Sequence, residues 1–232
     1  MGLKIPKMII TPPEVRYLND YTAGKTWKIE KYQHILETAF RLFSERGIEG
    51  VTMPEVAKAS GIGRSTLYRY FASKLDLVVA IGTWTWKEYI SAYNTSVPKE
   101  ELDAMSGAER FRFYMDAFLD LYRNHNDLLR FNYNFNSFLR YESGTSRQKE
   151  PYTKVVDRLS EMFHEVYERG IKDGTLRSDI SEEIMFSSSF HIMLAAATRY
   201  AIGLVYVVEG CDPEKELTML EEALLGMYIS DH

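Results

Sequence analysis

The 232-residue sequence has one cysteine, Cys211, and no long apolar run. A single cysteine excludes a disulfide within the chain and a metal site built from several cysteines. No apolar stretch approaches the ~18–20 residues that a membrane-spanning helix needs. The first residues also lack the basic-then-apolar pattern of a secretory signal. We therefore expect a cytoplasmic protein without a membrane partner.

The sequence also lacks the motifs of common catalytic and cofactor sites. It has no nucleophile elbow, no HExxH zinc motif and no glycine-rich phosphate loop. Glu161 and His164 form one Glu-x-x-His motif of the kind found in di-iron helical bundles, but a second copy is missing. We expect no catalytic residue, no metal site and no cofactor. A helical-bundle metal-binding enzyme is kept as an alternative.

The net charge of −5 conceals an uneven distribution of charge along the chain. Residues 1–74 carry 12 Lys and Arg against 7 Asp and Glu, whereas residues 75–232 carry 16 against 26. The first part is therefore basic and the remainder acidic. This asymmetry is typical of a chain that meets nucleic-acid phosphates at one end. Chance clustering of charges is the alternative.

Residues 51–77 predict two short helices joined by a tight turn, followed by the start of a third helix. Thr52 and Glu55 have the spacing of a capping box, and Pro54 fits the first helical turn. Gly61 stands where the chain must turn and is free to adopt a positive φ. This arrangement predicts a helix-turn-helix.

The second of these helices is expected to follow Gly63 and to run from residue 64 to residue 71. Leu67, Tyr70 and Phe71 recur at i, i+3 and i+4 and predict its buried stripe. The opposite face carries basic, hydroxyl and aromatic side chains. In a helix-turn-helix the second helix enters the DNA major groove, where arginine can bind guanine. A solvated helix in an ordinary bundle is the alternative.

These residues resemble the DNA-binding signature of the TetR family of bacterial transcriptional regulators. The resemblance covers about residues 31–81 and has three departures: Gly63 in place of a hydroxyl residue, Ser65 in place of Gly, and Leu75 in place of an acid. It is carried by Ile35-Leu36-Glu37-Thr38-Ala39, Leu42-Phe43, Gly47, Val51-Thr52-Met53, Val56-Ala57, Ser60-Gly61-Ile62, Ser65-Thr66-Leu67-Tyr68-Arg69-Tyr70-Phe71, Ser73-Lys74 and Leu77.

The resemblance implies an all-α fold with an N-terminal three-helix helix-turn-helix domain and a larger C-terminal helical bundle, about nine helices in total. It also implies a double-stranded DNA operator as partner. Thr52 and Lys74 are expected at phosphates, and Arg64 and Ser65 at base edges. The predicted DNA contacts are Thr52, Arg64, Ser65, Thr66, Tyr68, Arg69 and Lys74.

The domain organisation expected from the sequence has three parts. Residues 1–25 are expected to be a flexible arm, residues 26–77 the DNA-binding domain, and residues 78–232 an effector-binding and dimerisation domain. Residues 131–136 alternate with period 2, which favours a strand, but a lone strand would have no partner in this helical chain. Helices are therefore expected at about 27–46, 73–95, 107–124, 127–141, 151–172, 184–209 and 213–229, with a loop at 142–148.

The two closing helices, within about 181–230, are more apolar than a small bundle needs. A homodimer with a four-helix interface explains this composition and agrees with the resemblance. A buried central helix in a monomer is the alternative.

The C-terminal part is rich in aromatic residues, which suit a largely apolar pocket for a small-molecule effector. Ordinary core packing is the alternative for each of them, and His191 fits a core histidine best. The sequence thus predicts a ligand-responsive DNA-binding regulator, expected to be a repressor that binds a palindromic operator as a dimer and is released by a small apolar or aromatic effector. A helical interaction module that does not bind DNA is a further alternative. The candidate effector contacts are Trp86, Tyr89, Phe118, Tyr122, Phe135, Phe163, Tyr167, Phe190 and His191.

Overall fold

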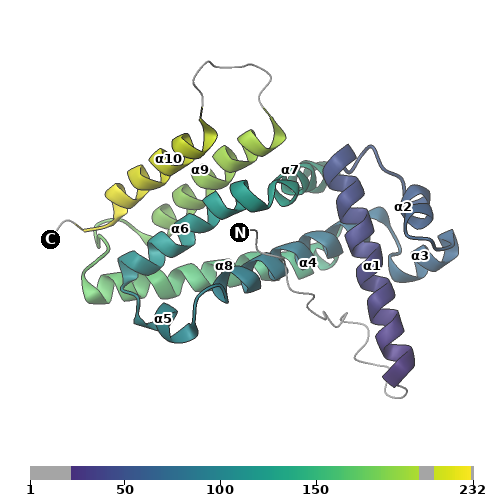
Figure 1. Cartoon of the computed structure of the whole chain (residues 1–232), viewed down its shortest axis with the longest axis horizontal. Coiled ribbons are helices and arrows are strands. Elements are labelled where there is room, and N and C mark those ends of the chain that lie inside the picture. Colours follow the sequence, from purple (N-terminus) through teal and green to yellow (C-terminus); the bar gives the residue numbers. More distant parts are fainter. Residues whose placement is uncertain (1–21, 204–211, 231–232) are drawn as a thin grey trace. The chain divides into compact units, whose positions relative to one another are not determined.

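The computed structural model describes residues 22–203 and 212–230. Within these ranges the chain forms ten helices and no β-strand (Figure 1). The predicted all-α fold is therefore confirmed. The helices are α1 (Thr22–Arg46), α2 (Met53–Ala59), α3 (Arg64–Tyr70), α4 (Lys74–Asn94), α5 (Lys99–Ala104), α6 (Gly107–Asn124), α7 (Asn126–Tyr141), α8 (Ser146–Asp173), α9 (Glu182–Ile202) and α10 (Pro213–Tyr228).

Several helix boundaries differ from the sequence-based expectation. The short helix α5 was not expected, and its N-terminus at Pro98 has no side-chain cap. Helix α1 begins at Thr22, so the last residues of the predicted arm are helical. Helix α9 ends at Ile202, where Gly203 has a φ of +90°. The predicted end of this helix at 209 lies outside the described residues.

The segment predicted as a loop at 142–148 contains the beginning of α8. Thr145 and Gln148 form a capping box there, because the Gln148 amide N–H donates to Thr145 Oγ1 and the Thr145 amide N–H donates to Gln148 Oε1. The helix at residues 126–141, by contrast, was predicted correctly despite its period-2 pattern. Helical packing of Phe131, Phe135 and Phe138 overrides that local alternation, because all three are buried.

The described residues divide into two compact units. The first unit contains residues 22–90 and 131–153, and the second contains residues 91–130, 154–203 and 212–230. Each unit therefore takes part of α4, α7 and α8. The predicted functional boundary near residue 78 is a separate matter and stays a prediction.

The first unit is built around α1. Its buried face presents Ile35, Ala39 and Phe43, all fully shielded from solvent. At one end Tyr32 stacks on Phe71 just after α3, with ring centroids 5.2 Å apart. Further along, Phe40 contacts Phe131 of α7 at 5.5 Å. Helix α1 thus contacts the end of the helix-turn-helix through Tyr32 and α7 through Phe40.

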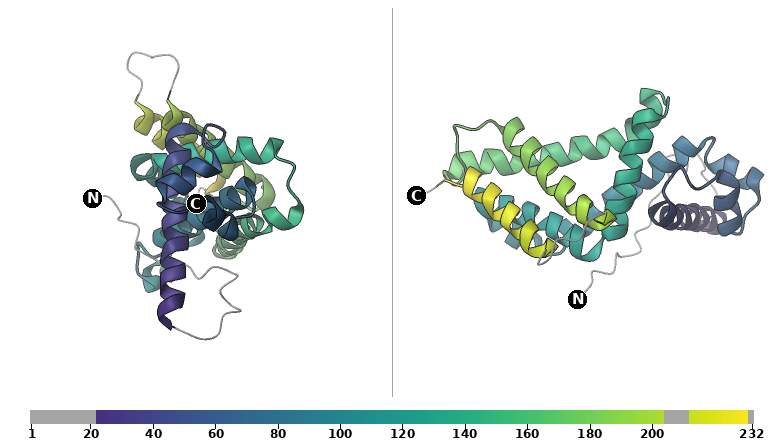
Figure 2. Two further views of the ribbon diagram at one scale, coloured as in Figure 1. Left: turned by 90° about the vertical axis from the view of Figure 1, so that its right-hand side faces the viewer. Right: turned by 90° about the horizontal axis from the view of Figure 1, so that it is seen from above.

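The second unit is built from α6, α9 and α10, which pack against one another. Figures 1 and 2 show α9 and α10 lying side by side. Phe111 of α6 contacts Phe163 of α8 at 5.8 Å and Tyr228 of α10 at 6.0 Å. Phe118 of α6 contacts Phe190 of α9 at 5.6 Å. Aromatic pairs thus connect α6 to α8, α9 and α10.

The beginning of α6 rests on the end of α8. Asp173 Oδ2 accepts a hydrogen bond of 2.8 Å from the amide N–H of Gly107, and Thr175 Oγ1 accepts one of 2.9 Å from the amide of Ala108. A Cβ atom at Gly107 would overlap the backbone of Gly170. The first amides of α6 therefore donate to side chains at the end of α8 and just after it. The two segments come this close because Gly107 has no side chain.

In the described ranges no helix combines the length and the apolar character that a membrane crossing requires.

Candidate nucleic-acid interface

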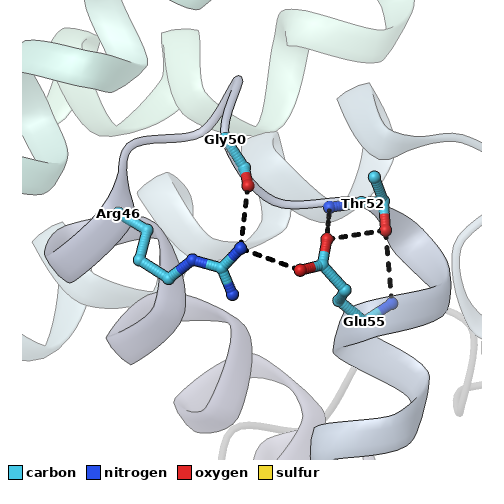
Figure 3. Close-up of polar contacts among 4 residues, drawn as sticks. All are labelled: Arg46, Gly50, Thr52 and Glu55. Atoms are coloured by element: carbon cyan, nitrogen blue, oxygen red, sulfur yellow. Dashed lines mark hydrogen bonds and ion pairs between the residues drawn. The ribbon is translucent and has the colours of Figure 1, made fainter.

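The connection between α1 and α2 is closed by a polar network (Figure 3). Arg46 Nη2 lies 2.8 Å from Glu55 Oε1 and donates to the carbonyl oxygen of Gly50 at 3.1 Å. Glu55 Oε2 accepts from both the amide and the hydroxyl of Thr52, each at 2.8 Å. The Glu55 amide in turn donates to Thr52 Oγ1 at 3.4 Å. The predicted capping box of Thr52 and Glu55 is thus confirmed, and Arg46 extends it to α1.

This network keeps Glu55 ionised. The hydrogen bond from Arg46, followed by those from Thr52, lowers the pKa of Glu55 to about 2. Both hydrogen-bond donors of Thr52 point at Glu55, so Thr52 primarily orients α2. The phosphate contact expected of Thr52 stays a prediction.

The turn between α2 and α3 depends on Gly61, whose φ is +65°. The Gly61 amide donates to the Lys58 carbonyl at 3.1 Å, and the Ile62 amide donates to the Ala57 carbonyl at 3.0 Å. These bonds are the usual ending of a helix whose next residue is left-handed, a conformation that glycine adopts without strain. The predicted turn at Gly61 is confirmed.

Helix α3 buries one side and exposes the other, as its pattern predicts. Leu67 is fully buried, and Phe71, which follows the last helical residue, is almost fully buried. Tyr70 is only half-buried. Of the predicted contact residues in this helix, Thr66 is half-buried, and the exposed ones are Arg64, Ser65, Tyr68 and Arg69.

Two of these exposed residues carry a positive charge that no acid among the described residues neutralises through an ion pair. Within the described ranges, neither Arg64 nor Arg69 has an ion pair or side-chain hydrogen bond. Arg46, by contrast, is committed to Glu55. An exposed helix with two uncompensated guanidinium groups is suited to the phosphates and base edges of DNA.

The region of the helix-turn-helix is similar to known sequences. The sequence model of the family described as "Bacterial regulatory proteins, tetR family" matches residues 35–81, which run from α1 to the beginning of α4. An HTH-type transcriptional regulator of Staphylococcus aureus is 30% identical over 132 residues, covering 43% of this chain and 71% of the relative. The chain belongs to the TetR family.

Solved structures extend the likeness of fold to most of this TetR-family chain. A transcriptional regulator from Saccharomonospora viridis in complex with choline has a TM-score of 0.68 at 19% identity, covering 87% of this chain and 99% of the other. FadR from Bacillus subtilis in complex with stearoyl-CoA has a TM-score of 0.64 at 15% identity, with 84% and 97% covered. These likenesses concern the fold alone, whereas the family membership makes the protein a helix-turn-helix transcriptional regulator rather than an enzyme.

The last predicted DNA contact of this TetR-family regulator, Lys74, is the first residue of α4. Ser73 caps the helix: its Oγ accepts a hydrogen bond of 3.1 Å from the Asp76 amide, and its own amide donates one of 2.9 Å to Asp76 Oδ2. Lys74 is half-buried, and its Nζ atom lies 5.8 Å from the centre of the Phe138 ring. This cation–π contact holds the ammonium group beside α7.

Three of the candidate effector contacts belong to the first unit. Trp86, Tyr89 and Phe135 are all buried there. Trp86 Nε1 donates to Asn132 Oδ1 at 3.3 Å, and the ring of Phe135 lies 4.6 Å from that of Tyr152. Each of these side chains has a packing role of its own.

The remaining candidates belong to the second unit, where some share one aromatic cluster. Phe186, which the sequence reasoning missed, links Phe163 at 5.0 Å to Phe190 at 5.8 Å. The spacing of Phe186 and Phe190 by four residues was the available signal. Phe118 contacts the same Phe190 ring. This cluster brings α6, α8 and α9 together.

Three further candidates lie apart from this cluster or at its edge. Tyr122 contacts Tyr200 at 6.1 Å, and the Tyr167 hydroxyl donates to the Ile180 carbonyl at 3.0 Å. His191 is exposed, so the expectation of a core histidine is wrong. It lies on the outer face of α9, and its ring is 6.4 Å from that of the adjacent Phe190.

The Glu-x-x-His motif does not assemble a metal site among the described residues. His164 Nδ1 instead lies 2.8 Å from Glu182 Oε2 of α9, and this contact raises the pKa of His164. In the ranges that the structure describes, no group of three or more His, Cys, Asp or Glu side chains could hold a metal ion.

Proposed function

We propose that this TetR-family regulator represses transcription by binding a near-palindromic operator as a homodimer, and that a small apolar or aromatic effector releases it. The observation that carries the proposal is the exposed face of α3, where Tyr68 lies between Arg64 and Arg69, two arginines without an ion pair in the part of the chain that the structure describes. Because it would act on DNA, we place its site of action in the cytoplasm.

The proposed DNA contacts fall into two chemical groups. Arg64 and Ser65, at the beginning of α3, suit base edges in the major groove. Lys74, at the beginning of α4, suits a phosphate. Thr52 belongs to the same group because it orients α2, and its own contact with a phosphate remains a prediction. Thr66, Tyr68 and Arg69 complete the proposed surface.

The proposed dimer uses α9 and α10. Both helices carry large apolar side chains that are exposed in the single chain, although such residues are usually buried. Gly226 of α10 has open space where a Cβ would stand, so a second helix could approach its backbone. A four-helix interface between two copies would cover these residues: Ile184, Ile192 and Ile202 of α9, and Met219, Leu220 and Met227 of α10.

The proposed effector contacts the aromatic cluster of the second unit. Phe118, Phe163 and Phe190 come from three helices, so a ligand inserted among them would change how α6, α8 and α9 pack. A population shift toward that packing would alter the fit of the dimer to its operator. Two structures of the same fold hold choline and stearoyl-CoA, which supports a ligand role for the helical part.

The proposal is tested with a duplex that the wild-type protein selects from a randomised library. Fluorescence anisotropy then compares wild type, Tyr68→Ala and Tyr133→Ala. Tyr133 of α7 is the matched control, because it is 52% exposed and Tyr68 is 48% exposed. We expect Tyr68→Ala to weaken binding about ten-fold or more, the equivalent of ~1.4 kcal/mol. Tyr133→Ala should bind like wild type.

Salt and sequence provide two further checks. Affinity for the selected duplex should fall steeply between 50 and 200 mM salt, because phosphate contacts release counterions. The selected sequences should contain an inverted repeat with half-sites about one helical turn apart or a multiple of it. Equal, weak binding to selected and scrambled duplexes would refute the proposal. Transcription from a promoter carrying the selected site distinguishes repression from activation.

A further inference from the structure

Two helix caps of the first unit are joined by one side chain. At the beginning of α4, Asp76 Oδ2 accepts from the amide and the hydroxyl of Ser73, at 2.9 and 2.8 Å. At the beginning of α8, Gln148 Oε1 accepts from the amide and the hydroxyl of Thr145, at 3.1 and 3.2 Å. Asp76 and Gln148 thus have the same role, each at the third position of its own helix.

The second polar atom of each side chain connects the two caps. Gln148 Nε2 donates to Asp76 Oδ1 at 3.1 Å. A glutamine has one acceptor and one donor at its tip, so Gln148 can cap α8 with the first and hold α4 with the second. A glutamate at this position would cap α8 equally well but would place a second carboxylate against Asp76. The amide is therefore required for the link and not for the cap.

The turn between α7 and α8 also packs on the first turn of α4. A Cβ at Gly144 would overlap the side chain of Leu75, so the turn approaches α4 as closely as its backbone allows. Phe138, near the end of α7, lies under the ammonium group of Lys74. Hydrogen bonding and packing thus fix the first turn of α4 from the same side.

We propose that Gln148 is a positioning residue for DNA binding, which holds the first turn of α4 so that Lys74 meets a phosphate. This inference rests on the proposed function, because the contact of Lys74 with phosphate belongs to it. Gln148 itself does not touch DNA in this proposal. It acts through Asp76, and its effect on affinity requires Lys74.

The test measures affinity for the selected duplex as a function of salt concentration. The principal variant is Gln148→Glu, which keeps the α8 cap and removes the donor to Asp76. The matched control is Ser146→Glu, which adds the same charge at an exposed position of the same helical turn. Lys74→Gln and the double variant Lys74→Gln with Gln148→Glu complete the cycle. Urea unfolding verifies that each variant is folded.

We expect Gln148→Glu and Lys74→Gln each to weaken binding about five-fold at 150 mM salt, the loss that follows when one phosphate contact is removed. The slope of log affinity against log salt should become shallower by about 0.9 in both. The double variant should be no weaker than either single variant. Ser146→Glu should keep the wild-type slope.

A rescue variant separates positioning from a general loss of stability. Asp76→Asn combined with Gln148→Glu exchanges donor and acceptor, so that the new amide can donate to the new carboxylate. We expect this double variant to recover the wild-type affinity and salt slope. Recovery would support the link between the caps as the cause.

Three results would overturn the proposal. The first is a loss in Gln148→Glu no greater than in Ser146→Glu. The second is independent losses, with the double variant about 25-fold weaker than wild type, the product of two five-fold effects. The third is an unchanged salt slope in Lys74→Gln. This result would show that Lys74 does not contact a phosphate, but it would not contradict DNA binding by α3. Failure of the wild-type protein to select any duplex would instead refute the proposed function itself.

Discussion

Arg46 and Glu55 are nine residues apart in the sequence, and their ion pair of 2.8 Å joins the last turn of α1 to the first turn of α2. A double-mutant cycle of Arg46→Met and Glu55→Gln should show favourable coupling in the free energy of unfolding, measured with urea at pH 7. The coupling should weaken at 1 M salt, because both groups are exposed and screened.

The pH dependence of this coupling follows from the lowered pKa of Glu55. The folded-state pKa of about 2 lies below the ordinary value of 4.5, so the stabilisation is present above pH 4.5 and is lost as the pH falls through 2. The cycle should therefore give favourable coupling at pH 5 and much weaker coupling at pH 2, where about half of the folded molecules have a protonated Glu55. Coupling that vanishes already at pH 5 would mean that the pair does not persist in solution.

Gly61 and Gly63, two residues apart, should respond in opposite ways to substitution. Gly61 has a φ of +65°, so Gly61→Ala should lower the free energy of unfolding by about 1–2 kcal/mol through backbone strain alone. Gly63 is the N-cap of α3 with a φ of −69° and no side-chain cap. Gly63→Ser should stabilise by a few tenths of a kcal/mol, because the hydroxyl can accept from a free amide. Equal effects in urea titrations would contradict this assignment.

Glu221 of α10 should make stability depend on pH. It is 2% exposed, and burial, followed by the proximity of Asp116 on α6, raises its pKa to about 7. Because this value exceeds the ordinary 4.5, the favourable contribution is complete below pH 4.5 and is lost as the pH rises through 7. Glu221→Gln should therefore be more stable than wild type at pH 8, by on the order of 2 kcal/mol, and similar at pH 4.5.

The adjacent residue provides the control for that experiment. Glu222 is exposed and pairs with Arg112 at 2.6 Å, and this contact lowers the pKa of Glu222. Glu222→Gln should give no gain in stability at pH 8. Thermal denaturation of both variants at the two pH values measures the difference, and a gain of equal size in both would show that net charge, not burial, is responsible.

Met227 of α10 should be part of the proposed dimer interface. It is 49% exposed in the single chain, and Val156 of α8 is 42% exposed. Met227→Lys should raise the dimer dissociation constant about ten-fold or more, because a charge would be buried between apolar side chains. Val156→Lys should leave it unchanged. Sedimentation equilibrium measures both, and a Met227→Lys dimer as tight as wild type would exclude this face of α10.

Local patterns predicted the helix-turn-helix well because its signals lie within a few residues. The capping boxes of Thr52 with Glu55 and of Ser106 with Glu109 are formed as their spacing indicates. The same rule would have placed the beginning of α8 at Thr145-x-x-Gln148, a signal that was present and overlooked. Helix α5 had no comparable signal, because a proline N-cap without a side-chain bond marks its beginning.

Contacts between distant segments could not be read from the sequence. The pairing of Arg46 with Glu55 depends on how α1 meets α2, and the link from Gln148 to Asp76 spans 72 residues. Burial was predicted correctly for Leu67 and wrongly for His191, because the face of α9 that points outward is set by packing on α6 and α10. The outward residues of α3 were identified because the apolar stripe opposite them is unambiguous.

The contact of Gly107 with Gly170 has a consequence for comparing regulators whose sequences have diverged. The family match ends at residue 81, so the helical part offers few fixed points for aligning one chain with another. A backbone crossing this close tolerates no side chain at Gly107, and the side chain of Leu176 leaves no room for a Cβ at Gly170. The Asp173 carboxylate that caps α6 adds a third requirement. Two small residues and an acid at these separations would therefore identify sequences that share this crossing, independently of the residues that read DNA.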